Sequence, residues 1–168
     1  RRSGVNLAVV QGERIVLPRL SDVVADLREL ALTSEDEAFL LGTDVSEAFH
    51  QVPLHESERR FTVAALAGKY YVFKVLVFGS SSAPTVWGRY AAFLGRSTAA
   101  VVGSDPLRLQ VYVDNPLYSC IAKLPRAARL FSVALLWALV LGYPLAWHKT
   151  EGGSDLSWIG AKVSLCSA

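Results

Sequence analysis

Residues 40–49 read LLGTDVSEAF and place an aspartate, Asp44, directly after an apolar run. Residues 109–116 read LQVYVDNP and place Asp114 after a second apolar run in the same way. Two such strands side by side would present both carboxylates at one edge of a sheet, where hard oxygen ligands suit a divalent cation. The alternative is that each aspartate only caps a strand or opens a turn.

The segments around these two stretches alternate between helical and strand patterns. Apolar residues at helical spacing predict an amphipathic helix over residues 22–32 with Ser21 as its N-cap. The other expected elements are a strand at 38–45, a turn or short helix at 46–50, a hairpin of 60–66 and 70–77, a flexible break at 79–82, a helix from 84 to about 94, two strands within 108–121 around a turn at 114–116, a helix from 125 to near 142, and a final hairpin at 156–165. This order predicts an α+β domain whose antiparallel sheet is covered by helices on one face.

The composition is that of a globular chain with a sizeable core. It has 168 residues, of which 52% are hydrophobic and 19% charged, which excludes a disordered chain and predicts one domain over residues 1–168. The longest apolar stretch, residues 130–141, is too short to span a bilayer, so we expect no membrane partner. Cys120 and Cys166 form no spacing motif, which indicates a reducing, intracellular compartment. The mean hydropathy of +0.32 and the absence of an initial Met indicate a fragment of a larger polyprotein.

Charge is distributed unevenly along the chain. Residues 1–58 carry 5 basic and 11 acidic side chains, a balance of −6, whereas residues 59–168 carry 12 basic and 4 acidic ones, a balance of +8. A basic part beside an acidic part suits a polyanion that runs past a metal site. Ordinary surface charge is the alternative.

Several short motifs follow one another in a fixed order. They are LPRLSD at 17–22, DVSEAF at 44–49 continued by HQVPLH at 50–55, FGSSSAP at 78–84, YVDN at 112–115, Lys149, and WIG at 158–160. In this order and spacing they resemble the palm domain of reverse transcriptases, especially those of retrotransposons, over about residues 17–163. Each motif alone is common by chance, but the ordered set favours an α+β polymerase palm with a partial fingers region.

The resemblance implies two-metal nucleotidyl transfer to a primer 3′-hydroxyl. Asp44, Asp114 and the backbone carbonyl of Val45 would hold Mg²⁺ or Mn²⁺, and Lys149 would act as general acid toward the pyrophosphate. Asn115 would be the fourth catalytic position.

Other motif residues would contact the substrates. Phe49 would stack under the incoming sugar and select deoxynucleotides, and Gly79 would let the backbone approach the template–nucleotide pair. The substrate-binding residues implied by the resemblance are Val45, Phe49, Phe78, Gly79, Tyr112, Trp158 and Gly160. The implied partners are an RNA or DNA template–primer, a deoxynucleoside triphosphate, and the remaining fingers, thumb and RNase H segments of the parent polyprotein, in the cytoplasm or nucleus.

The chain departs from the family pattern at the second metal-binding motif. Asn115 stands where the family has a second aspartate, so the cluster has two carboxylates where three are usual. Val77 replaces a usual proline, and Arg1 or Arg2 would be a remnant of the basic fingers strands. Two main hypotheses stay open: an RNA-directed DNA polymerase domain that is active in its parent, and a catalytically degenerate palm that only binds nucleic acid or a partner. An unrelated α+β domain is the third.

Overall fold

The computed structural model describes residue 6, residues 12–103 and residues 105–165, so Arg1, Arg2 and Cys166 lie outside the described residues. The chain divides into two compact units. One, called here the hairpin unit, takes its described residues from Arg1–Ile15 and Glu47–Arg89. The other, the sheet unit, takes them from Val16–Ser46 and Tyr90–Ala168. In the part of the chain that the structure describes, no helix has the length and hydrophobicity that crossing a bilayer requires.

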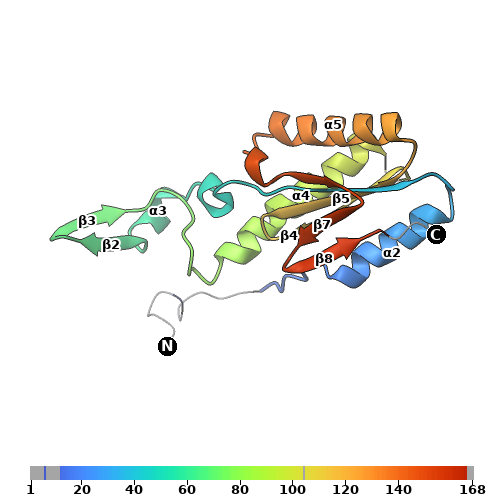
Figure 1. Ribbon diagram of the computed structural model, residues 1–168. Coiled ribbons are helices and arrows are strands. Elements are labelled where there is room, and N and C mark those ends of the chain that lie inside the picture. The colour runs from blue at the N-terminus through green and yellow to red at the C-terminus, as the bar shows by residue number, and fades with distance from the viewer. Residues whose placement is uncertain (1–5, 7–11, 104, 166–168) are drawn as a thin grey trace. The chain divides into compact units, whose positions relative to one another are not determined.

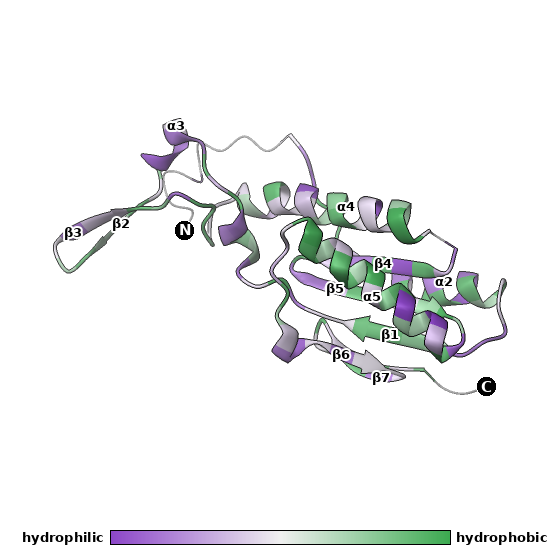
Figure 2. Cartoon of the chain, turned by 90° about the horizontal axis from the view of Figure 1, so that it is seen from above, coloured by the Kyte–Doolittle hydropathy of each residue, from purple (hydrophilic) through white to green (hydrophobic). Residues whose placement is uncertain are grey.

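The sheet unit (Figure 1) is built on a four-stranded antiparallel sheet with the strand order β4-β5-β1-β6, whose four strands are labelled in Figure 2. Its strands are β1 (Ala38–Gly42), β4 (Leu107–Tyr112), β5 (Asn115–Ile121) and β6 (Glu151–Gly153). The predicted strands at 38–45 and within 108–121 are confirmed, although β1 ends three residues early. Strand β6 was not predicted, because three residues that include two glycines carry no strand signal.

Helices cover both faces of this sheet. Leu117 and Tyr118 are neighbours on β5 and point to opposite faces. Tyr118 packs in one core cluster with α5 (Leu124–Val140), while Leu117 packs in another with Val23 of α2 (Leu20–Ala31) (Figures 1 and 2). The fold class is therefore confirmed, with one correction: helices were expected on one face only. Apolar side chains of β5 are buried on both faces along most of the strand, so helices pack against both faces of the sheet.

Two helix boundaries differ from the prediction for identifiable reasons. The N-cap of α2 is Arg19 and not Ser21, because the Asp22 carboxylate accepts a hydrogen bond from the Arg19 N–H at 2.7 Å. Helix α4 (Ala83–Val102) runs about two turns beyond the expected end. It ends before Gly103, whose φ of +90° supplies the left-handed conformation that commonly follows a helix.

The predicted final hairpin is confirmed as β7 (Asp155–Trp158) and β8 (Ala161–Ser164). Leu156 and Trp158 of β7 join the core cluster that contains Leu117, so this hairpin shares the α2 face of the sheet. A 3-10 turn, η2 (Trp147–Lys149), precedes β6.

The hairpin unit contains the predicted hairpin as β2 (Val63–Leu66) and β3 (Lys69–Val72). Ala67 and Gly68 form its two-residue turn with φ of +50° and +72°. The expected short helix near 46–50 is the 3-10 turn η1 (Ala48–Gln51), and a short helix not predicted from the sequence, α3 (Glu56–Arg59), follows it.

Candidate active site

Backbone hydrogen bonds place the two motif aspartates side by side at one end of the sheet. Beyond the last residue of β1, the Thr43 N–H donates to the Pro116 carbonyl at 3.0 Å and the Val45 N–H donates to the Asp114 carbonyl at 2.7 Å. On its other side, the Asp44 carbonyl accepts from the Ala146 N–H at 2.8 Å. Asp44 is thus held against the β4–β5 turn that carries Asp114.

The turn itself lies one residue earlier than expected. Tyr112 pairs with Asn115, so Val113 and Asp114 are the two turn residues and Asn115 and Pro116 already belong to β5. Val113 has a φ of +54°, a conformation that is costly for a β-branched residue. The expectation of a turn at 114–116 was wrong because Pro116 serves the ladder as a hydrogen-bond acceptor, a role that needs no N–H.

Each aspartate has a donor on its Oδ1 atom. The Lys149 Nζ lies 3.1 Å from Asp44 Oδ1, and the Asn115 Nδ2 donates to Asp114 Oδ1 at 2.8 Å. The Asp44 side chain is 14% exposed and that of Lys149 is 55% exposed. An aspartate at position 115 could not donate in this way and would repel Asp114, so the amide changes both the charge and the hydrogen bonding of the site.

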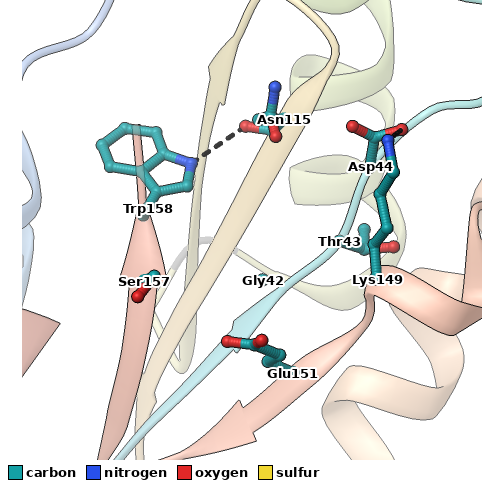
Figure 3. A pocket seen from close by; sticks show the side chains of 8 residues that line it. All are labelled: Gly42, Thr43, Asp44, Asn115, Lys149, Glu151, Ser157 and Trp158. Atoms are coloured by element: carbon teal, nitrogen blue, oxygen red, sulfur yellow. Dashed lines mark hydrogen bonds and ion pairs between the residues drawn. The ribbon is translucent and has the colours of Figure 1, made fainter. Parts of the chain in front are cut away.

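Three of these residues, Asp44, Asn115 and Lys149, line a small open pocket on the sheet unit, and Asp114 is not among its lining residues (Figure 3). Its lining residues are Gly42, Thr43, Asp44, Asn115, Lys149, Glu151, Ser157 and Trp158. The Trp158 Nε1 donates to the Asn115 carbonyl at 3.1 Å, which ties the β7–β8 hairpin to the motif strand. The Tyr112 ring meets the Trp158 ring edge-on with 6.3 Å between centroids. Four of the site residues expected from the sequence therefore line one pocket.

Three polar residues of this pocket were not predicted: Thr43, Glu151 and Ser157. Thr43 Oγ1 lies 2.9 Å from Thr150 Oγ1, and Glu151 is the register partner of Gly42 across the β1–β6 pair. The pairing of β6 with β1 brings Glu151 to the pocket, and no sequence pattern predicts that pairing.

The other expected sheet-unit residues have structural positions of their own. Val45 is 1% exposed and forms a bridge with Leu145. Gly160 lies in the β7–β8 turn with a φ of +81°, directly after Ile159 at +45°. Their predicted contacts with metal and primer stay predictions.

The remaining expected residues belong to the hairpin unit. The rings of Phe49 and Phe78 meet edge-on with centroids 4.9 Å apart, and Phe49 also meets the Trp87 ring at 6.4 Å. Phe49 is buried, at 8% exposed, whereas Phe78 is 66% exposed. Gly79 follows with a φ of +86°, a conformation that favours glycine. These contacts give Phe49 a packed position on η1.

The oxygen donors fit a hard divalent cation in kind. Asp44 and Asp114 supply carboxylates from adjacent backbone segments, and Asn115 supplies an amide. Across residues 6, 12–103 and 105–165, no group of three or more His, Cys, Asp and Glu side chains could hold a metal ion. The motifs themselves contain two carboxylates, Asp44 and Asp114, because position 115 is an asparagine.

Comparison with known proteins assigns the chain to a family. A family model described as reverse transcriptase (RNA-dependent DNA polymerase) matches residues 10–163. The chain therefore belongs to the reverse transcriptase family, as its ordered motifs predict. No curated protein sequence matches it.

Solved structures show the same fold. The foamy viral protease-reverse transcriptase in complex with RNA/DNA hybrid matches with a TM-score of 0.63 and 19% identity, over 76% of this chain and 16% of that chain. The native prototype foamy virus enzyme matches with 0.63 and 19%, over 77% and 17%. The foamy viral enzyme in complex with dsDNA matches with 0.63 and 18%, over 79% and 27%. This chain thus spans less than a third of the length of these structures, and the likeness shows the fold of the palm region.

Proposed function

We propose that this chain is the palm and part of the fingers of an RNA-directed DNA polymerase of the retrotransposon type. The observation that carries the proposal is the hydrogen bond between the Val45 N–H and the Asp114 carbonyl. It sets the backbone next to Asp44 against Asp114 at one end of the sheet, in a chain that belongs to the reverse transcriptase family.

In this proposal Asp44, Asp114 and the Val45 carbonyl hold Mg²⁺ or Mn²⁺. The metal supplies activation of the primer 3′-hydroxyl and charge neutralisation of the leaving pyrophosphate. The Lys149 Nζ lies 3.1 Å from Asp44 Oδ1 and the Lys149 side chain is 55% exposed, so this side chain is able to turn from Asp44 to the pyrophosphate and donate a proton to it.

The proposed substrates are a primed RNA or DNA template and deoxynucleoside triphosphates. Phe49 is the proposed sugar-stacking residue, and its packing against Phe78 and Trp87 would hold its ring in one orientation. Trp158 and Gly160 would position the primer end. The foamy viral enzymes of the same fold were solved with RNA/DNA hybrid and with dsDNA, which supports a nucleic acid partner. The remaining fingers, thumb and RNase H segments of an intracellular parent polyprotein would complete the enzyme.

Asn115 favours a second candidate function, a palm that binds nucleic acid or a partner without catalysis. The amide donates to Asp114 Oδ1 where the family has a metal-binding carboxylate. An amide in place of a carboxylate leaves the site with one negative charge fewer, and the contact engages one oxygen of Asp114.

Primer extension by the full-length parent protein on an RNA template separates the two functions. We expect extension with Mg²⁺ or Mn²⁺, and we expect Asp114→Ala to lower kcat/KM by at least about 10²–10³-fold. Asn115→Asp should lower the Mg²⁺ concentration for half-maximal rate by roughly tenfold, because it adds a third carboxylate. The isolated 168-residue chain should show little or no activity.

Asp36→Ala is the matched control, since Asp36 is an exposed aspartate in the connector before β1. It should leave extension unchanged. A parent that is silent until Asn115→Asp is introduced would transfer the assignment to the binding-only palm.

A further inference from the structure

One side chain, Asn6, bridges the loop that carries the Phe-Gly motif. The Asn6 Nδ2 donates to the Gly79 carbonyl at 2.8 Å, and the Ser81 N–H donates to the Asn6 Oδ1 at 3.0 Å. Both ends of a single amide are therefore used on two backbone groups that lie more than 70 residues away in the sequence. A carbonyl on one side and an N–H on the other fix which way the amide points.

The two backbone groups that Asn6 contacts, the Gly79 carbonyl and the Ser81 N–H, lie in the loop before α4. Gly79 adopts a φ of +86°, and no atom of the described residues beyond its chain neighbours lies within 4 Å of the point where a Cβ would stand. Ser81 lies two residues before Ala83, the first residue of α4. The Asn6 side chain supplies an acceptor for the Ser81 N–H and a donor for the Gly79 carbonyl.

Two residues that follow Asn6 in the chain, Glu13 and Ile15, contact α4. The Arg89 Nη2 lies 2.9 Å from Glu13 Oε1, and both side chains are more than half exposed. Ile15 lies against Gly88, where an added Cβ would come within 3.4 Å of the Ile15 side chain. All of these residues belong to the hairpin unit, and only Asn6 among them reaches the 79–81 loop through these contacts.

We propose that Asn6 is a positioning residue, which holds residues 78–82 in the conformation that receives the base pair of template and incoming nucleotide. The inference rests on the proposed polymerase function and adds to it a residue outside every motif found in the sequence. Asn6 acts through the loop backbone and needs no contact with substrate.

Two variants of the full-length parent separate the two hydrogen bonds. Asn6→Ala removes both. Asn6→Asp keeps an acceptor for the Ser81 N–H but sets a carboxylate oxygen against the Gly79 carbonyl, which replaces attraction with repulsion. Glu13→Gln is the matched control, because it weakens the exposed ion pair with Arg89 and leaves the loop contacts intact.

Hydrogen exchange at the Ser81 amide tests whether Asn6 holds the loop in place, and this measurement does not require polymerase activity. Exchange should be roughly fivefold faster in Asn6→Ala, as expected from the loss of one hydrogen bond, and close to the parent rate in Asn6→Asp and Glu13→Gln. Unchanged exchange in Asn6→Ala would overturn the inference.

Steady-state kinetics test the functional half. Both Asn6 variants should raise the KM for the deoxynucleotide by roughly tenfold while kcat stays within about twofold and the affinity for template–primer is unchanged. If kcat, template–primer affinity and melting temperature all fall, Asn6 only supports the fold. If Glu13→Gln raises the KM for the deoxynucleotide as much as the Asn6 variants do, the hydrogen bonds of Asn6 have no specific role in nucleotide binding. If the parent extends no primer under any condition, the proposed function fails and the nucleotide role falls with it, while the exchange rates still decide whether Asn6 holds the loop.

Discussion

Two hairpins of this chain have similar local geometry and opposite surroundings. Both β2–β3 and β4–β5 are antiparallel pairs joined by two-residue turns whose first residue, Ala67 or Val113, has a positive φ. In β4–β5 every residue is buried or half-buried, and α5 and α2 cover its two faces. In β2–β3 seven of the eight strand residues are exposed, including Tyr70 at 80%.

The difference shows that a β-rich apolar run predicts a strand without predicting what covers it. A two-stranded hairpin is marginal by itself, whereas a hairpin in a covered sheet takes its stability from its neighbours. The motif residues Asp114 and Asn115 lie on the covered hairpin, where packing holds their backbone in place. The exposed hairpin should open locally far more often.

The largest expected effect comes from truncating a matched pair of leucines, one in each hairpin. Leu117 on β5 is 1% exposed and Leu66 on β2 is 69% exposed. Leu117→Ala should lower the free energy of unfolding by about 2–5 kcal/mol because it leaves a cavity in the core. Leu66→Ala should lower it by less than about 0.5 kcal/mol. Urea denaturation of the 168-residue chain measures both values.

The stability costs of the same two substitutions can also be measured in the parent protein. If other segments of the parent cover β2–β3, Leu66→Ala should cost more there than in the 168-residue chain, while the cost of Leu117→Ala should not change. Equal costs for the two leucines in the 168-residue chain would contradict the exposed state of β2–β3.

A smaller effect is expected at the two turns. Val113→Gly relieves a β-branched residue at a φ of +54°, and after the entropic cost of glycine the chain should gain about 1 kcal/mol. Ala67→Gly at +50° should gain only a few tenths of a kcal/mol, because alanine lacks the β-branch. Chemical denaturation of both variants gives the difference.

The Val113 turn also carries Asp114, so its variant should lose polymerase activity in the parent while gaining stability. A Val113→Gly protein that is both less stable and fully active would show that the left-handed valine is neither strained nor needed.

The sequence predicts the parts of the site that depend on strand ends and fails at those that depend on pairing. Asp44 and Asp114 were found because apolar runs end at each of them, and Trp158 because the WIG sequence at 158–160 belongs to the ordered set of motifs. Glu151 was missed because β6 exists only through its pairing with β1. Asn6 was missed because a lone asparagine more than 70 residues from its partners has no periodic signal. The end of α4 was expected near residue 94, but the helix continues through Gly95 and ends at Val102, before Gly103.

The smallest expected effect concerns a polar contact in the cover of β4–β5. Asp26 on α2 accepts a hydrogen bond from the Gln110 Nε2 of β4 at 2.6 Å, and burial raises the pKa of the Asp26 carboxyl above its usual value, with the Gln110 bond and Arg108 opposing the rise. Folding therefore favours the protonated form, a contribution that is complete below about pH 3.8 and is lost as the pH rises through the folded pKa.

At pH 7 an ionised Asp26 should therefore lower the stability of the packing between α2 and β4–β5. Within the described part of the chain, hairpin β2–β3 has no such covering helix. Asp26→Asn keeps an acceptor for Gln110 and removes the charge, so the variant should have a higher free energy of unfolding than the unsubstituted chain at pH 7. This gap in the free energy of unfolding should narrow as the pH falls toward 4. Urea midpoints at both pH values measure this gap, and the exposed Asp36→Asn should show none. A gap that widens on acidification, or a less stable Asp26→Asn at pH 7, would mean that the hydrogen bond to the charged carboxylate outweighs the cost of burying it.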